Sequence, residues 1–245
     1  MNDKLFETIQ KGNIIVKHVN LSFSISDRNK KIIDEIWIEE CKKRPNLFNG
    51  ETLSFLSIKK ENNNIIVSGQ FTDYKNALVS RNKPDLGLNI IQIGVSGITL
   101  IEENNKKFIL FSIRTDKVTD YPGYIELVPS GNIDKSVLLK DGTIDYVTKL
   151  KEEFFEETGV PTKYIKKIKS ICLAYDCSNQ VFDVGCSIEL TVGKNEIIKT
   201  FSKVTEYKNP QFIQIDDLEN FINKNKIRLV PTSLAILECF FDTKP

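Results

Sequence analysis

The sequence predicts an α/β sandwich over its C-terminal two-thirds, preceded by a smaller α+β unit. Short β-branched segments that resemble strands alternate with segments of helical periodicity, which is typical of a sheet covered by helices. The 245 residues are 40% hydrophobic and 27% charged, an ordinary globular composition for one large domain or two small ones. Turn-forming residues cluster at 82–87 and divide the chain into an N-terminal extension, 1–86, and a main domain, 87–245.

Charge and hydropathy exclude several classes of function. The formal net charge is +1, whereas a general nucleic-acid binder needs a basic surplus to displace counterions. No apolar run approaches the roughly 20 residues that span a bilayer. The polar N-terminus also lacks the apolar core of a signal peptide. We therefore expect a cytoplasmic protein without nucleic-acid or membrane partners.

Two residue counts narrow the chemistry. The single histidine, His18, excludes sites with several histidine ligands, and any catalytic triad would have to include it. An ordinary strand histidine is the simpler interpretation of His18. The five cysteines are odd in number and contain no CxxC pair, so we expect them to be reduced and mostly buried. Half of a zinc site at Cys172 and Cys177 is a weaker alternative.

The N-terminal extension contains both extended and helical patterns. Alternating apolar residues predict a strand over 14–25. A helix is expected from Asp27, as its cap, to about Lys43, where Pro45 follows. Two strands with a polar turn between them come next, and Thr72 or Asp73 then caps a short helix. The expected ranges are 51–60 and 64–71 for these strands and 74–78 for the short helix.

The main domain repeats this alternation with longer elements. Gly159 is placed to stop the central helix, and Pro161 follows it. The expected strands are 89–101, 106–114, 121–129, 168–175 and 181–190, and the expected helices are 143–158, 216–224 and 231–241.

The central helix carries an unusual run of four glutamates within six residues. On a helical wheel, Val147, Leu150 and Phe154 form the buried stripe. The strip of acidic residues beside that stripe starts at its edge and consists of Glu157, Glu153 and Glu156.

Like charges at this spacing repel each other, and carboxylates near the C-terminal end also oppose the helix dipole. A bound hard divalent cation such as Mg²⁺ would offset both effects, because Mg²⁺ prefers oxygen ligands. A solvated acidic face, balanced by Lys149, Lys151 and Lys163, is the alternative that the residues alone leave open.

The segment EEFFEETGV closely resembles the core of the Nudix box, G-x5-E-x7-R-E-U-x-E-E-x-G-U, in which U is aliphatic. Phe154 fills the apolar position, and the upstream segment 128–134, VPSGNID, is similar to the family's P-G-G-x-x-E loop, with Gly131 at the first glycine of the box. The other matching positions are Glu153, Glu156, Glu157, Gly159 and Val160.

The resemblance implies a Nudix-type α/β/α sandwich with a mixed sheet and a site that uses Mg²⁺ or Mn²⁺. It implies hydrolysis of a nucleoside diphosphate that is linked to another group. By the same resemblance, Glu153, Glu156 and Glu157 are metal ligands and the Gly131 carbonyl is a further one. Glu153 or Glu157 is also the candidate general base.

Three further segments resemble the Nudix branch that splits UDP-glucose and UDP-galactose, in which an N-terminal extension precedes the Nudix fold. These segments are 45–50, 71–75 and 117–123. The resemblance makes Phe48, Asn49 and Tyr74 candidate contacts of the base or ribose, with turn and core roles as the alternatives.

Two kinds of site residue are proposed outside the matched motifs. Arg114, at the end of a strand, is a candidate phosphate contact or an ordinary surface arginine. Asp183 and Glu189, on the strand 181–190, are weaker candidates for another carboxylate ligand, because strand carboxylates usually face solvent.

The chain departs from the family pattern at the arginine of the box, which is Glu152 here. In the family that arginine pairs with a neighbouring glutamate, a role that Lys149 or Lys151 is free to take. Asp134 replaces the first-loop glutamate, and the segment between Gly131 and the helix is seven residues longer than usual.

Three functions follow from these observations. The first is hydrolysis of a nucleoside diphosphate sugar such as UDP-glucose to a nucleoside monophosphate and a sugar 1-phosphate. The second is a Nudix-fold protein that binds or senses nucleotides without efficient catalysis, which the glutamate at 152 favours. The third is a Nudix pyrophosphatase for ADP-ribose or a dinucleotide. A monomer and a homodimer are both compatible with the sequence.

Overall fold

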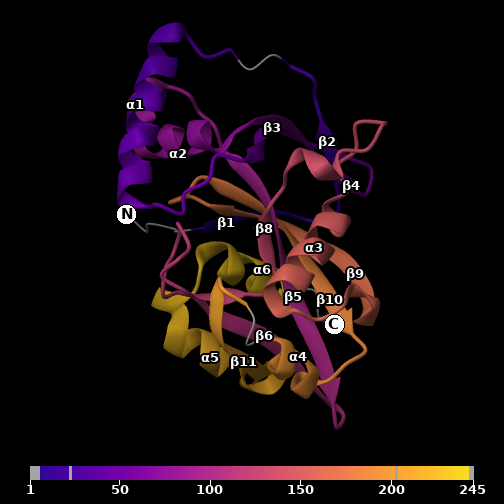
Figure 1. The fold of residues 1–245 in the computed structure, drawn as a ribbon. Coiled ribbons are helices and arrows are strands. Elements are labelled where there is room, and N and C mark those ends of the chain that lie inside the picture. The colour runs from indigo at the N-terminus through magenta and orange to yellow at the C-terminus, as the bar shows by residue number, and fades with distance from the viewer. Residues whose placement is uncertain (1–5, 22–23, 202–203, 243–245) are drawn as a thin grey trace.

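The protein is described by a computed structural model that covers residues 6–21, 24–201 and 204–242. Its strands join one mixed sheet, in which β1, β9, β10, β5, β3, β4 and β2 follow one another (Figure 1). The strands are β1 (Phe6–Lys11), β2 (Asn13–His18), β3 (Glu51–Glu61), β4 (Asn64–Asp73), β5 (Gln92–Glu103), β6 (Lys106–Arg114), β7 (Ile125–Leu127), β8 (Ser130–Asn132), β9 (Ile165–Asp176), β10 (Val181–Leu190) and β11 (Tyr207–Gln214).

Helices cover both faces of this sheet, so the α/β/α sandwich expected from the sequence is confirmed. Helices α1 and α2 lie together at one end of the molecule, whereas α4 and α5 lie at the other (Figure 1). The helices are α1 (Asp27–Lys43), α2 (Tyr74–Asn82), α3 (Tyr146–Thr158), α4 (Lys194–Phe201), α5 (Leu218–Asn225) and α6 (Pro231–Asp242). Within the described ranges no helix combines the length and apolar character that crossing a bilayer requires.

The core is divided by the sheet into two apolar clusters. Leu150 and Phe154 of α3 belong to the first cluster, together with Ile93 and Val95 of β5. The second cluster joins α6 to the opposite face of β5, where Ile98 lies. Alternate residues of β5 therefore serve both layers, because successive side chains of a strand point to opposite faces.

The sheet runs without interruption from the N-terminal extension into the main domain. Leu53 of β3 is paired with Ile93 of β5, and its backbone N–H also donates to the carbonyl of Ile133 (2.9 Å). The first apolar cluster likewise extends to Ile14 and Val16 of β2. The extension and the main domain thus share both backbone pairing and core.

Strand β5 is the element that organises this sheet. It pairs in parallel with β10 along one edge, while its other edge contacts β3 and β8 near its start and β6 near its end. The loop from β7 to β8 and the helix α3 are thereby brought beside the same strand.

Several element boundaries differ from the sequence-based expectations. The expected strand over 14–25 is wrong beyond His18, because the ladder of β2 with β4 ends at the pair His18–Gly69; residues 22–23 of that expected strand lie outside the described residues. Helix α1 has the expected range, but its cap is Ser26, whose Oγ accepts from the Asn29 N–H (3.2 Å). The side chain of Asp27 is therefore not the cap.

The main domain shows similar differences. The expected strand 121–129 is reduced to β7, because Tyr121 has a φ of 52° and Gly123 one of 80°, which turn the chain. Helix α3 begins at Tyr146, three residues later than expected, since Asp145 is its cap. Helix α4 and strands β1, β8 and β11 were not predicted.

Candidate active site

Helix α3 is fixed in length by its caps and in rotation by its buried face. The Asp145 side chain accepts a hydrogen bond from the Thr148 N–H (3.0 Å), and Gly159 ends the helix in the left-handed conformation (φ 69°). Leu150 and Phe154 are fully buried, as the helical pattern predicted. This rotation turns a strip of carboxylates toward the neighbouring strand β8.

Glu157 is the most deeply buried carboxylate of this strip, with 3% of the residue exposed. Its Oε2 accepts a hydrogen bond from the Ser130 backbone N–H at the start of β8 (3.0 Å). Burial, and then the nearby carboxylates of Glu153 and Glu126, raise the pKa of Glu157 well above its usual value. Such a group favours either a proton or a bound cation, because an unpaired buried charge is costly.

Glu153 lies one helical turn earlier and packs directly over Gly131. A Cβ atom at Gly131 would overlap the carboxyl carbon of Glu153, so any side chain at this position of β8 would displace the Glu153 carboxylate. The Lys149 Nζ lies 3.0 Å from Glu153 Oε1 and 3.0 Å from Asp134 Oδ2. Burial raises the pKa of Glu153 to about 7 against the opposing effect of Lys149.

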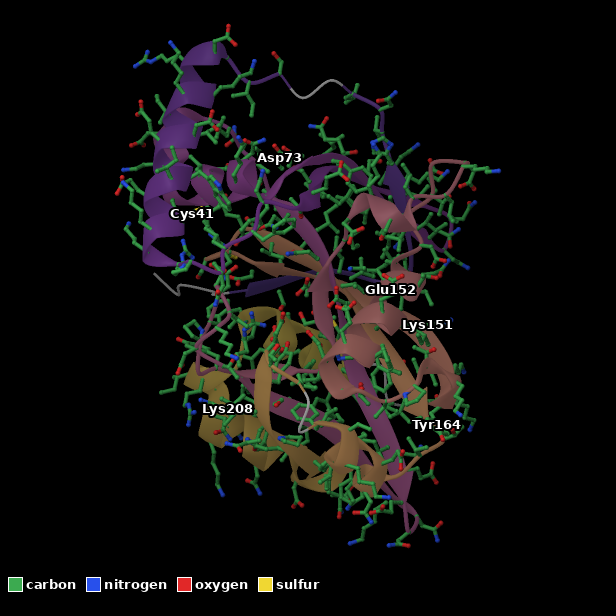
Figure 2. The ribbon with its side chains drawn as sticks, in the orientation of Figure 1. Cys41, Asp73, Lys151, Glu152, Tyr164 and Lys208 are labelled. Carbon is green, nitrogen blue, oxygen red and sulfur yellow. The ribbon has the colours of Figure 1, made fainter. Side chains whose placement is uncertain are left out.

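The lysine that pairs with Glu153 is therefore Lys149, one of the two that the sequence left open. It also links the helix to the loop residue Asp134, so Lys149, Glu153 and Asp134 form a three-residue ion cluster. Lys151 and Glu152 are exposed on the outer side of α3 (Figure 2). Glu156 is also exposed, but it lines the cavity described below.

Arg114, at the end of β6, is a partly buried component of the site. Its Nη1 donates to the Glu126 carboxylate and lies 3.4 Å from the Tyr207 hydroxyl, which itself donates to Glu126 (2.5 Å). Its Nε donates to the backbone carbonyl of Asp120 (2.9 Å). Of the two sequence-based alternatives, the surface arginine is wrong, because only 15% of the side chain is exposed.

The strip of carboxylates borders an open cavity of about 1130 Å³. Nine carboxylate side chains line it against three cationic ones, so its lining carries an excess of negative charge. The carboxylates are Glu51, Asp120, Glu126, Asp134, Glu153, Glu156, Asp176, Asp183 and Glu206, and the cations are Arg114, Lys117 and Lys149. Cations that bind together with an anionic ligand would offset this charge.

The N-terminal candidates lie in the same cavity with different environments. Phe48 is 79% exposed at the rim, where an aromatic face is free for a ligand. The Asn49 Oδ1 accepts the Lys75 N–H (2.9 Å) in the first turn of α2, which is a structural role. Tyr74 packs edge-on against Trp37, and burial raises the pKa of its hydroxyl.

Of the two strand carboxylates proposed from the sequence, one lines the cavity and the other does not. Asp183 lines the cavity and is 6% exposed, and its Oδ2 accepts from the Ser96 hydroxyl (3.1 Å). The Ser96 hydroxyl lies 2.8 Å from that of Ser130, which is next to the Glu157 contact. Glu189 is not in the cavity lining and faces Lys166 at 4.0 Å.

Two residues of the site were missed by the sequence reasoning. Glu126 is 4% exposed and carries the ion pair with Arg114. Asp120 joins the cavity wall to α2 through Arg81. Glu126 stands alone in its segment and reaches the site through the pairing of β6 with β7, which places Ser112 opposite it. Asp120 lies in the segment 117–123, and the resemblance of that segment to the UDP-sugar branch is the signal that could have found it.

A metal ion is implied by the sequence resemblance, and the donor chemistry at this site suits one. Glu153, Glu157 and the Gly131 carbonyl offer oxygen atoms, the ligand type of Mg²⁺ and Mn²⁺. Within the described ranges, however, no three carboxylate, imidazole or thiol side chains are already grouped to hold a metal ion. Binding would therefore require small side-chain shifts, and Glu153 would have to share its carboxylate with Lys149.

This arrangement predicts that Lys149→Met strengthens Mn²⁺ binding by about tenfold, because a positive charge beside a ligand carboxylate repels a divalent ion. Titration with Mn²⁺, followed by electron paramagnetic resonance, measures the affinity directly. The matched variant Lys149→Arg keeps the charge and should bind Mn²⁺ as the unchanged protein does. An unchanged or weaker affinity in Lys149→Met would show that Glu153 is not a metal ligand.

No family model and no curated protein matches this sequence. Solved structures with a similar fold include the NUDIX domain of Shewanella oneidensis NrtR complexed with ADP ribose, which is 13% identical and has a TM-score of 0.44, covering 61% of this chain and 86% of that chain. A C. elegans Ap4A hydrolase binary complex is 11% identical with a TM-score of 0.37, covering 62% and 98%. A MutT/nudix family protein from Enterococcus faecalis is 13% identical with a TM-score of 0.33, covering 78% and 57%. Likenesses at this level do not decide the function, which depends on the site of this chain.

Proposed function

We propose that this protein is a Nudix-type, metal-dependent pyrophosphatase that hydrolyses a nucleoside diphosphate sugar such as UDP-glucose. The products would be a nucleoside monophosphate and a sugar 1-phosphate. The observation that carries this proposal is a pair of glutamates beside a large polar cavity: Glu153 packs over Gly131, and Glu157 accepts the Ser130 N–H behind it. This pair combines the sequence resemblance with oxygen atoms that suit a divalent cation.

The reaction replaces one phosphorus–oxygen bond by another. A water oxygen attacks one phosphorus atom, the bond to the bridging oxygen breaks, and that oxygen leaves with the second phosphate. The water loses one proton in the process. A bound Mg²⁺ or Mn²⁺ would supply charge neutralisation and a lowered water pKa.

The chain's own residues are proposed to divide the remaining tasks. Glu153, Glu156 and Glu157, with the Gly131 carbonyl, would hold the metal. Glu153 borders the cavity whereas Glu157 lies behind it, so Glu153 is the better placed of the two candidate bases. Arg114 would contact a phosphate oxygen, because guanidinium groups bind phosphate well.

The substrate proposal is supported by the size and lining of the cavity. A volume of about 1130 Å³ exceeds what a pyrophosphate alone needs and suits a ligand with two bulky substituents. Phe48, at the rim, offers a face for a base, and polar side chains such as Gln92 and Asn179 are suited to hydroxyl groups. The N-terminal extension, 1–86, is proposed as a unit that supplies the part of the cavity wall where Phe48 lies.

The second candidate function is nucleotide binding without efficient hydrolysis. Two observations favour it: Glu152 occupies the position of the arginine of the box, and Lys149 already neutralises Glu153. ADP-ribose or a dinucleotide remains the alternative substrate class for an active enzyme.

A substrate panel separates these functions. UDP-glucose, UDP-galactose, ADP-ribose and a diadenosine polyphosphate are each incubated with Mg²⁺ or Mn²⁺, and a phosphatase converts the monoester products to inorganic phosphate. We expect metal-dependent release that is fastest with the UDP-sugars. Faster release from ADP-ribose would reassign the substrate, and binding with no release from any compound would establish the sensing function instead.

A further inference from the structure

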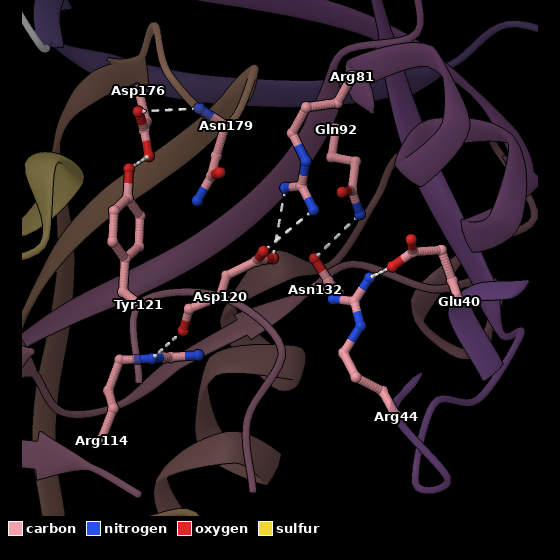
Figure 3. Close-up of polar contacts among 10 residues, drawn as sticks. All are labelled: Glu40, Arg44, Arg81, Gln92, Arg114, Asp120, Tyr121, Asn132, Asp176 and Asn179. Atoms are coloured by element: carbon pink, nitrogen blue, oxygen red, sulfur yellow. Dashed lines mark hydrogen bonds and ion pairs between the residues drawn. The ribbon is translucent and has the colours of Figure 1, made fainter. Parts of the chain in front are cut away.

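The loop 115–124, between β6 and β7, forms part of the cavity wall, and its adjacent residues Asp120 and Tyr121 are bound by side chains of other elements. The Tyr121 hydroxyl donates to the Asp176 carboxylate (2.6 Å). Tyr121 has a φ of 52°, in the left-handed region that residues with side chains rarely adopt. Such conformations persist where the surrounding contacts over-determine them, and they concentrate at functional sites. Asp120 is held from two further directions (Figure 3).

The first contact that holds Asp120 comes from the N-terminal extension. Arg81 of α2 places its Nη2 3.0 Å from Asp120 Oδ1 and its Nη1 3.4 Å from Asp120 Oδ2 (Figure 3). Only 11% of the Arg81 side chain and 32% of the Asp120 side chain are exposed. A two-pronged contact between guanidinium and carboxylate fixes orientation as well as distance. The extension thereby determines where Asp120 lies.

The second contact that holds Asp120 comes from strand β6. The Arg114 Nε donates to the Asp120 backbone carbonyl (2.9 Å), and its Nη1 is taken by Glu126. Within the described part of the chain, the Nη2 of Arg114 has no hydrogen-bond partner. The guanidinium is therefore held by two of its three nitrogen atoms, and the third remains for a ligand in the cavity.

We propose that Arg81 is a positioning residue that aims Arg114 at a phosphate group of the ligand, acting through Asp120. This inference rests on the phosphate-contact role proposed above for Arg114. The Arg81 fork holds the Asp120 side chain, and the Asp120 carbonyl holds Arg114 Nε. Loss of the fork would let Asp120 move and would release one of the two anchors of the Arg114 guanidinium.

Arg81 is not itself a phosphate contact. Both of its terminal nitrogens are engaged by Asp120, and it is absent from the cavity lining. A purely structural clamp between α2 and the loop is the alternative role for the pair. The two roles differ in whether the effect of Arg81 on ligand binding depends on Arg114.

The test is a double-mutant cycle on equilibrium binding of UDP in the presence of Mg²⁺, measured by titration calorimetry on the full chain. The variants are Arg81→Met, Arg114→Lys and their combination. Arg114→Lys keeps the charge but removes Nε and the planar fork. Arg81→Lys is a second variant that keeps the charge, in case Arg81→Met does not fold. Lys75→Met is the matched control, because it removes another ion pair of α2, with Asp34 (2.6 Å), outside the cavity.

We expect Arg81→Met to weaken UDP binding by about tenfold, and Arg81→Lys to weaken it less. The affinity of Lys75→Met for UDP should equal that of the unchanged protein. In the Arg114→Lys background, Arg81→Met should add less than about a twofold effect, because contacting residues are not additive. Equal weakening in both backgrounds would establish the structural clamp and overturn the proposal. So would unchanged binding in Arg81→Met, or no binding of UDP by the unchanged protein. Because no turnover is required, a protein that binds UDP but cleaves no nucleotide sugar would refute the proposed activity and not this inference.

Discussion

Glu157→Gln should abolish most of the hydrolytic activity, with a fall in turnover of at least about 10²- to 10³-fold. Glutamine keeps the size of the side chain and an oxygen that accepts the Ser130 N–H, so the fold is preserved. The variant loses the negative charge that the proposed metal site needs. The measurement is phosphate-monoester release from the best substrate of the panel with Mg²⁺.

The same variant has an opposite effect on stability in the absence of metal. Burial raises the pKa of Glu157 in the folded protein above its value in the unfolded chain. The folded state therefore binds the proton more tightly, and the penalty for ionising Glu157 grows as the pH rises through the interval between the two pKa values. Glu157→Gln should thus raise the melting temperature in EDTA at pH 8, with no gain below about pH 4.

Glu152→Gln is the matched control for both measurements, because Glu152 lies on the same helix but is exposed. It should leave turnover and melting temperature nearly unchanged. Unimpaired turnover in Glu157→Gln, with a clean Glu152→Gln control, would contradict the assignment of Glu157 to the metal site.

Gly131→Ala is expected to have the second largest effect, a loss of activity of about 10²-fold or more, because small displacements of catalytic groups are costly. The added methyl group would overlap the carboxyl end of Glu153, which must then rotate away from β8. The atoms that clash belong to a flexible side chain, so the fold itself should tolerate the substitution. Mn²⁺ affinity should fall together with turnover.

Thermal unfolding distinguishes this effect from simple misfolding. We expect the melting temperature of Gly131→Ala to change little, since backbone at this position has an ordinary conformation and pairs with Val95 of β5. Combining Gly131→Ala with Glu153→Ala should cause little further loss beyond Glu153→Ala alone, because the methyl group acts through that carboxylate. Wild-type Mn²⁺ binding in Gly131→Ala would show that Glu153 does not reach the metal.

The central helix could be predicted from the sequence because its signals are local. Apolar spacing placed Leu150 and Phe154 in the core, and Gly159 marked the end of the helix, as the structure confirms. The start was placed too early, since the Asp145 cap lies among several polar residues that offer similar signals. The α/β sandwich followed from the alternation of strands and helices, and its α/β/α layering followed from the resemblance to the Nudix family.

Strand β11 illustrates why other elements were missed. It contains Pro210, and its pairing with β6 shifts register between Lys208 and Gln211. Proline removes a ladder hydrogen bond, which lowers the strand signal of the segment. The strand forms because β6 offers it an edge, and that is a property of the tertiary structure.

In the candidate site, too, some residues follow from local sequence signals and others depend on the tertiary structure. Glu153, Glu156 and Glu157 follow from one short motif, although the burial of Glu157 is deeper than its place at the edge of the helix stripe suggested. The choice of Lys149 over Lys151 depends on the loop that brings Asp134 within reach. No spacing rule encodes such a distance across the fold.

The continuity of the sheet joins the N-terminal extension to the strands that carry the candidate site. A fragment that began at residue 87 would lack Leu53, the partner of Ile93, and would bare the apolar flank where Ile14 and Val16 now lie. An uncovered strand edge beside apolar side chains is a template for self-association. We therefore expect such a fragment to aggregate, and we expect changes in the extension to alter the geometry of the candidate site.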